Sequence, residues 1–178
     1  LLPGNYAVAE IVPAGWDQTG ATCFGSSDPG NINLAAGENV TCTFHNVKRS
    51  TIVVTKQTTG GDGLFSFTGA PLGNFSLATS GGTVTNAGRA QRTFANILPG
   101  AYSITETATN GWNLTAAVCD DTSAPDTIDL APGETVTCTF ANTKRGSLTV
   151  VKQASGGDGT FPFLSQALGN FNLATAGG

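Results

Sequence analysis

The sequence predicts an all-β protein made of tandem β-sandwich domains. β-branched and aromatic runs of about five to eight residues alternate with Gly, Pro, Asn and Asp turns. No helical period stands out, and a long internal repeat runs through the chain. Many short strands with frequent turns are typical of a sandwich or barrel. In the most complete repeat we expect strands at 51–57, 64–68, 74–79, 90–95, 101–108, 112–119, 126–130 and 135–142.

The repeat has a period of 96 residues and contains no gaps. Residues 1–49 align on 97–145 with 25 identities, and residues 50–82 align on 146–178 with 18 identities in 33 positions. Residues 83–96 have no second copy. The alignment predicts three segments, which are the C-terminal half of a preceding repeat at 1–49, a complete β-sandwich repeat at 50–145, and the N-terminal part of a following repeat at 146–178.

Two interpretations of the partial repeats remain open. The chain starts Leu1-Leu2-Pro3 without Met, so we expect a mature or internal fragment of a longer repeat protein. Alternatively, the two end pieces of one subunit complete a neighbour's domain, and chains join head to tail. In both cases the expected partners are neighbouring copies of the same repeat or subunit. The units meet after Arg49 and Arg145 without a Gly/Ser linker, which favours a stiff string of domains.

The charge content argues against several classes of partner. Charged residues make up 11% of the chain, against roughly 25% in a typical soluble protein. The net charge is -4, whereas nucleic-acid binding needs a basic surface. No apolar run approaches the roughly 18 residues that a membrane span requires. We therefore expect neither a nucleic-acid partner nor membrane insertion by this fragment.

The cysteines indicate disulfides and not a metal site. No C-x-x-C pair is present and His45 is the only histidine, so metal ligands of the right type and spacing are missing. No cofactor is expected either. If the cysteines pair within each repeat, they close two loops of similar length. Disulfides are typical of an oxidising, extracytoplasmic compartment. The expected pairs are Cys23–Cys42 and Cys119–Cys138.

An apolar stripe ends in one polar residue on three of the expected strands. Alternate residues of a strand face the same side, which places Lys56, Glu106 and Asn142 on apolar faces. Charged residues are almost never buried without a partner, so we expect these three side chains to meet inside the domain. The alternative is that each group reaches solvent at its strand end. The partial repeats show the same pattern at Lys152, Glu10 and Asn46.

A lysine, a glutamate and an asparagine buried together can react. Burial favours the neutral form of a lysine amine, which is a nucleophile. A buried carboxyl group can hydrogen-bond the amide oxygen and carry protons to the departing ammonia. Folding holds the groups in contact, which substitutes for high concentration. The product is an intramolecular Lys–Asn isopeptide bond, formed once per domain as a maturation step.

Three segments of the complete repeat resemble a known family. They are Val54-Thr55-Lys56, then Tyr102-Ser103-Ile104-Thr105-Glu106 through Gly111-Trp112, and Phe140-Ala141-Asn142. The sequence is similar to the prealbumin-like domains of bacterial surface proteins, the collagen-adhesin B-type and SpaA-type pilin family. In that family the lysine lies on the first strand, the catalytic glutamate lies in a Y-x-(aliphatic)-x-E segment, and the asparagine ends the last strand. Cys119 and Cys138 depart from the usual pilin domain.

The resemblance implies a role for each polar residue. Lys56 is expected to join Asn142, with Glu106 as the catalytic proton shuttle. Glu10 is expected to serve the equivalent bond of the preceding unit. Asn46 is expected to pair with a lysine before the fragment, and Lys152 with an asparagine beyond it. The glutamates act only in this autocatalytic step.

These observations predict a structural protein of the extracellular space. We expect a tandem-repeat subunit of a filament, pilus or surface stalk, stabilised by intradomain isopeptide bonds and disulfides. The alternative is an adhesin domain that binds a host or matrix ligand. An enzyme is the third class, and no recurring catalytic set supports it, because His45 is replaced by Ala141 in the other copy. The similarity of the partial copies to the complete one favours a shaft.

Overall fold

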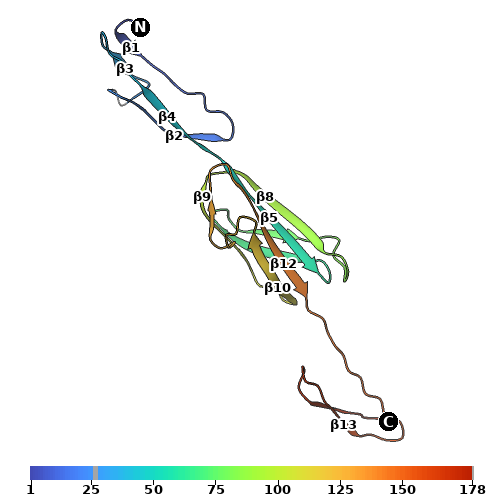
Figure 1. The fold of residues 1–178 in the computed structure, drawn as a ribbon. Helices are drawn as coiled ribbons and strands as arrows, with labels where there is room; N and C mark the ends of the chain where they lie inside the picture. The colour runs from blue at the N-terminus through green and yellow to red at the C-terminus, as the bar shows by residue number, and fades with distance from the viewer. Residues whose placement is uncertain (26–27, 178) are drawn as a thin grey trace. The chain divides into compact units, whose positions relative to one another are not determined.

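The computed structural model describes residues 1–25 and 28–177 (Figure 1). Every regular element in these ranges is a β-strand, which confirms the all-β prediction. No helix in the described ranges is long and apolar enough to cross a membrane. The chain divides into two compact units, Leu1–Arg145 and Gly146–Gly178, and each is described by itself.

Residues 50–145 form a sandwich of two four-stranded sheets. The first sheet has the order β10-β12-β5-β8 and the second has the order β11-β9-β6-β7. All eight strands expected in this range are present, with ends that differ by a few residues. Their bounds are β5 Ser50–Thr59, β6 Leu64–Ala70, β7 Phe75–Ala78, β8 Gly88–Ile97, β9 Gly100–Glu106, β10 Trp112–Cys119, β11 Ile128–Leu130 and β12 Thr135–Lys144.

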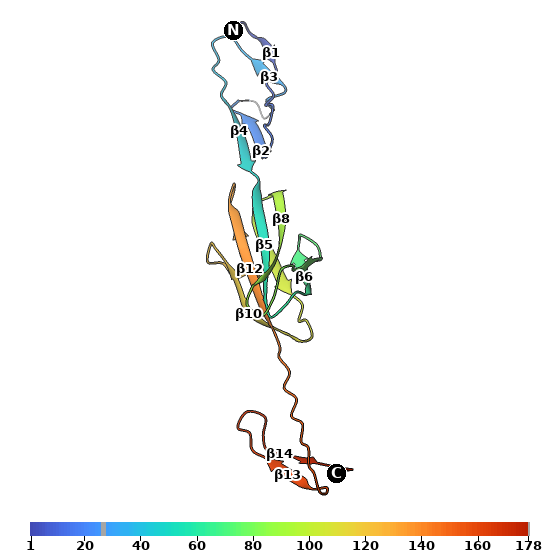
Figure 2. The same ribbon diagram turned by 90° about the vertical axis from the view of Figure 1, so that its right-hand side faces the viewer.

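The first and last strands of the sandwich lie side by side and run parallel. β5 and β12 pair over nine residues, from Thr51 opposite Thr135 to Thr59 opposite Thr143. Figures 1 and 2 show these two strands adjacent along their whole length. A parallel pair needs a long crossover, and here the rest of the domain supplies it. The chain therefore starts and finishes the domain on neighbouring strands.

The core lies between the two sheets and follows the expected alternation. Along β5, every second residue from Ser50 to Thr58 is buried, and the residues between them are half-buried. Phe67 stacks on Phe75 at a centroid distance of 4.9 Å and meets Phe140 edge-on at 5.1 Å. These ring contacts join strands of both sheets. The remaining fully buried apolar side chains include Ile52, Val54, Phe65, Ile104, Ile128, Leu130, Val136 and Cys138.

Residues 1–49 fold as two separate strand pairs. β1 pairs antiparallel with β3, and β2 pairs antiparallel with β4. These elements correspond by the 96-residue shift to β9, β11, β10 and β12 of the complete sandwich. β1 stops at Tyr6, whereas β9 continues to Glu106 because β6 pairs with its second half. The bounds are β1 Gly4–Tyr6, β2 Trp16–Cys23, β3 Ile32–Leu34 and β4 Cys42–Lys48.

Residues 146–177 contain a single hairpin, made of β13 Thr160–Phe163 and β14 Phe171–Ala174. They correspond to β6 and β7. Residues 146–154, the counterpart of β5, form no strand. In the complete domain β5 takes its backbone hydrogen bonds from β12 and β8. Residues 146–154 have neither neighbour within their own unit. Without a neighbouring strand to hydrogen-bond its backbone, this segment does not form a β-strand.

Two disulfides cross adjacent antiparallel strands. Cys119 on β10 lies opposite Cys138 on β12, and Cys23 on β2 lies opposite Cys42 on β4. These are the pairs expected from the sequence. The Cys138 side chain is fully buried and belongs to the core, so its bond fixes β10 to β12 from the inside. Each bond spans a sequence separation of 19 residues.

The disulfides give the first prediction. Non-reducing peptide mapping should recover Cys23–Cys42 and Cys119–Cys138, and a Cys23–Cys119 peptide would contradict it. Replacing Cys119 and Cys138 together by Ala should lower the free energy of unfolding of residues 50–145 by about 3 kcal/mol, from the entropy of the released loop. The same double change at Cys23 and Cys42 is the control and should leave that unfolding free energy unchanged.

Candidate functional site

Three strands place three polar side chains in the core. Lys56 extends inward from β5, Glu106 ends β9, and Asn142 lies near the end of β12. Their placement follows from the strand alternation, because each is two residues beyond a buried apolar side chain. The side chain of Lys56 is fully buried, that of Glu106 is 2% exposed, and residue Asn142 is 3% exposed. The structure thus brings together the three residues predicted from the sequence.

Each of the three side chains contacts the other two. Lys56 Nζ donates a hydrogen bond to Asn142 Oδ1 at 2.8 Å. Asn142 Nδ2 donates to Glu106 Oε1 at 2.6 Å. Lys56 Nζ lies 3.4 Å from Glu106 Oε2, which has no hydrogen-bond partner although it is buried. The carboxyl group therefore bridges the amine and the amide nitrogen. We call Lys56, Glu106 and Asn142 the triad.

The surroundings of Lys56 favour its neutral form. Burial lowers the pKa of the Lys56 amine below its ordinary value of 10.5, and the nearby Glu106 carboxylate opposes the shift without cancelling it. Two backbone carbonyls, of Phe140 and Gln57, also accept from Nζ at 3.2 Å. The amine is thus held in one position, in contact with the Asn142 amide, with little access to water.

Sequence reasoning missed one residue of this site. The ring of Phe65 lies under Lys56 Nζ, 4.2 Å from it to the ring centroid, and Phe65 is fully buried. The ring closes the site on the side of β6. The repeat contained the signal, because Phe161 stands at the same nine-residue distance from Lys152, and there the separation is 4.1 Å.

Residues 1–49 and 146–177 contain parts of the same site. Asn46 Nδ2 donates to Glu10 Oε1, as Asn142 does to Glu106. Glu10 Oε2 is buried without a hydrogen-bond partner, as is Glu106 Oε2. Lys152 belongs to the other unit, where it is half-buried beside Phe161. Lys56 contacts both Glu106 and Asn142. Among the described residues of Leu1–Arg145, no lysine takes the equivalent position beside Glu10 and Asn46.

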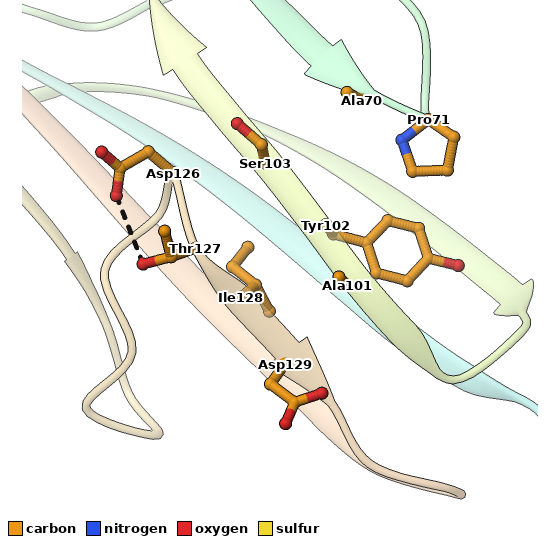
Figure 3. A pocket seen from close by; sticks show the side chains of 9 residues that line it. All are labelled: Ala70, Pro71, Ala101, Tyr102, Ser103, Asp126, Thr127, Ile128 and Asp129. Carbon is orange, nitrogen blue, oxygen red and sulfur yellow. Dashed lines mark hydrogen bonds between the residues drawn. The ribbon is translucent and has the colours of Figure 1, made fainter.

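A surface hollow of about 520 Å³ lies on the complete sandwich (Figure 3). Residues of the paired strands β9 and β11 line it, together with Ala70 and Pro71. Small side chains make up most of it, including Ala101 and Ser103. Figure 3 shows a single hydrogen bond among the lining residues, from Thr127 Oγ1 to Asp126 Oδ1 at 3.5 Å. The hollow does not present the converging polar groups of a specific ligand site.

The acidic residues do not gather into a metal site. In residues 1–25 and 28–177, no group of three or more His, Cys, Asp or Glu side chains could hold a metal ion. Asp126 and Asp129 line the surface hollow, and Asp120 accepts from the backbone amide of Thr137. The triad is therefore the one place in the complete sandwich where buried titratable groups with complementary chemistry meet.

Comparison with protein families decides the classification. A family model described as a prealbumin-like fold domain of the SpaA type matches residues 52–144, and a second model with the same description matches residues 1–44. The chain belongs to this family. The resemblance seen in the lysine, glutamate and asparagine segments is thereby confirmed. No curated protein matches the chain.

Membership in the SpaA-type family agrees with the fold. SpaA-type prealbumin-like domains are typical of pilins and surface proteins, and they are generally non-catalytic structural domains. Together with the two disulfides, this indicates a secreted or surface protein.

Proposed function

We propose that this SpaA-type chain is a structural repeat of an extracellular filament, pilus or surface stalk, and that each complete domain is locked by a Lys56–Asn142 isopeptide bond. The observation that carries the proposal is the buried triad, in which the amine, carboxyl and amide groups are in mutual contact. The 96-residue repeat supplies the second half of the argument, because similar units in a row suit a shaft.

The reaction replaces one amide by another. The neutral Lys56 amine attacks Cγ of Asn142, so that the Nζ–Cγ bond forms and the Cγ–Nδ2 bond breaks. Glu106 Oε2, 3.4 Å from Nζ, takes the proton that the amine loses. The same carboxyl group, whose Oε1 lies 2.6 Å from Nδ2, then passes that proton to the leaving nitrogen. One ammonia leaves, and no oxidant, metal or cofactor is consumed.

The position of the bond gives it a mechanical consequence. The chain enters the domain on β5 and leaves it on β12, which are neighbours in one sheet. A bond from Lys56 to Asn142 connects the entering and leaving strands directly. Tension then passes through covalent bonds and bypasses residues 57–141, a segment of 85 residues. A load-bearing shaft benefits from this arrangement, whereas an enzyme gains nothing from tensile strength.

The contacts at the first joint support units placed in a row. Arg49 donates to Asp17 Oδ1 at 2.7 Å and to the carbonyl of Asn96 at 2.8 Å. Ser50 Oγ donates to the carbonyl of Ala131 at 2.7 Å. These bonds hold the residues on either side of the junction without an intervening linker. We propose that the units are the 96-residue segments defined by the repeat, and that the filament lies outside the cell.

The covalent bond itself is tested by mass. Intact-protein mass spectrometry of the reduced chain should show the loss of one ammonia for the Lys56–Asn142 bond. Glu106→Ala should restore the unmodified mass, because it removes the group that moves the proton. Tandem mass spectrometry should recover the branched peptide that contains Lys56 and Asn142.

A conservative variant separates chemistry from folding. Glu106→Gln keeps the side-chain volume and should also restore the mass, while circular dichroism continues to report β-structure. Lys144→Ala, at an exposed lysine outside the triad, is the matched control and should still lose ammonia. An unmodified mass for the unaltered chain refutes the proposed bond.

The mechanical role is tested by pulling the chain from its two ends. In single-molecule force spectroscopy under reducing conditions, residues 50–145 of the unaltered chain should not extend, because the bond carries the load. Lys56→Met fills the same space without an amine. It should allow the domain to unfold and release a contour length on the order of 300 Å, at about 3.3–3.6 Å per residue.

The matched control here is Lys144→Met, which should behave as the unaltered chain does. Release of the full contour length by the unaltered chain would mean that the bond, even if formed, does not carry the load, and would remove the argument for a shaft.

A further inference from the structure

A β-bulge lies on β10 opposite the asparagine of the triad. The eight residues of β10 form seven pairs with β12, so one residue of β10 is extra. Leu114 lies opposite Asn142, and Ala116 lies opposite Ala141. Thr115, between Leu114 and Ala116, is therefore the bulged residue. Bulges are frequent beside reactive sites, where they re-aim side chains. This bulge adjoins the residue whose amide is proposed to react.

The spacing of inward-facing residues along β10 requires the bulge. Ala117 packs against the core, and so does Trp112, five residues before it. Side chains alternate along a strand, so residues five apart face opposite sides unless one residue between them bulges out. With Thr115 bulged, both face the core, and the Trp112 ring meets Phe65 edge-on at a centroid distance of 5.2 Å. Phe65 is the ring under Lys56 Nζ, so the bulge also connects β10 to the lysine end of the triad.

The Thr115 hydroxyl compensates for the interrupted ladder. A bulge disrupts the backbone hydrogen bonds of a strand pair locally. Thr115 Oγ1 donates a hydrogen bond to the carbonyl of Ala141 at 3.0 Å, across the strand pair. On its other side β12 pairs with β5 without a register shift. Ala141 immediately precedes Asn142, so the hydroxyl holds the backbone from which the reacting side chain extends.

The first unit repeats this arrangement. β2 and β4 have a register shift at the same place, and Thr19 is the bulged residue. Thr19 Oγ1 donates to the carbonyl of His45 at 3.2 Å. His45 precedes Asn46, which is the asparagine of that unit. The acceptor residue differs between the copies, because His45 stands where Ala141 does, whereas the threonine is the same. In both copies the hydroxyl thus holds the carbonyl before the asparagine.

We propose that Thr115 is a positioning residue for the isopeptide reaction. Its hydroxyl holds the Ala141 carbonyl, and this keeps the Asn142 amide in contact with the Lys56 amine. Thr115 acts through Ala141 and takes no part in the exchange of bonds. The inference rests on the proposed function and adds a geometric requirement to it. Geometry has a large effect on the rate of such a reaction, because held reactants need no chance encounter.

Removing the hydroxyl tests the inference. Thr115→Val keeps the shape of the side chain but cannot donate to Ala141. The full chain is made by cell-free synthesis under oxidising conditions, and its loss of ammonia is followed over time by intact-protein mass spectrometry. A misplacement of about 1 Å can cost on the order of 100-fold in rate, so Thr115→Val should react about tenfold more slowly than the unaltered chain, or slower still.

Three further variants define the cause. Thr115→Ser returns a hydroxyl to the same place and should recover most of the rate. Thr115→Ala removes the hydroxyl without a branched side chain and should be slowed as Thr115→Val is, so the result does not depend on one variant. Thr93→Val, at an exposed threonine of β8 in the same sheet, is the matched control and should react as the unaltered chain does.

Two readouts separate positioning from stability. Circular dichroism should show each variant folded, and a hydroxyl that only stabilised the fold would leave the rate of a fully folded chain unchanged. The pH dependence of the rate should keep its shape in Thr115→Val, because Lys56 and Glu106 keep their surroundings. A changed pH dependence overturns the inference, since Thr115 would then act on the titration of the triad.

The remaining outcomes distinguish the inference from the proposed function. Bond formation in Thr115→Val at the rate of the unaltered chain overturns the inference and leaves the proposed function standing. Slowing that Thr115→Ser does not relieve also overturns it, because the hydroxyl is then not the cause. An unaltered chain that never loses ammonia removes the proposed function and the inference with it.

Discussion

The rest of the domain depends on one constraint, which is that a lysine amine lies in the apolar core. An uncompensated charge at that depth costs several kcal/mol, so the amine needs partners or must be neutral. The structure meets the need with Glu106, Asn142 and two backbone carbonyls, and burial itself lowers the pKa of Lys56. The features that make the lysine tolerable in the core also make it a nucleophile in contact with an amide. Burial of the Lys56 amine thus requires the partners that hold it in the core and also favours the neutral, nucleophilic form.

The same constraint explains why the sheet order matters. The triad can form only if β5 and β12 are neighbours and β9 faces them from the other sheet. A parallel pair made of the first and last strands brings the two ends of the domain together, and the proposed reaction between Lys56 and Asn142 would convert that proximity into a covalent link. The disulfide Cys119–Cys138 adds a second link on β12, toward β10. β12 is thereby attached on both sides, to its parallel and its antiparallel neighbour.

Much of this could be predicted from the sequence, because strand alternation and a long repeat are strong local signals. The eight strands of the complete repeat followed from β-branched and aromatic runs between turns. The inward position of Lys56, Glu106 and Asn142 followed from strand parity. The contribution of Phe65 did not, since a ring that packs over an amine depends on the distance between two strands. The loss of strand structure at 146–154 was also missed. That segment has a strand-forming sequence like that of β5, but a strand needs a neighbour to accept its backbone hydrogen bonds. The 96-residue division into units stays a prediction.

A density map of the full chain at high resolution shows whether the contact between Lys56 and Asn142 has become a bond. We expect continuous density between Lys56 Nζ and Asn142 Cγ, at the length of an amide C–N bond of about 1.33 Å, with no density for Asn142 Nδ2. Glu106 should then lie against the new amide. Separate density for an intact Asn142 side chain, with Lys56 Nζ at hydrogen-bond distance from Oδ1, would contradict the account.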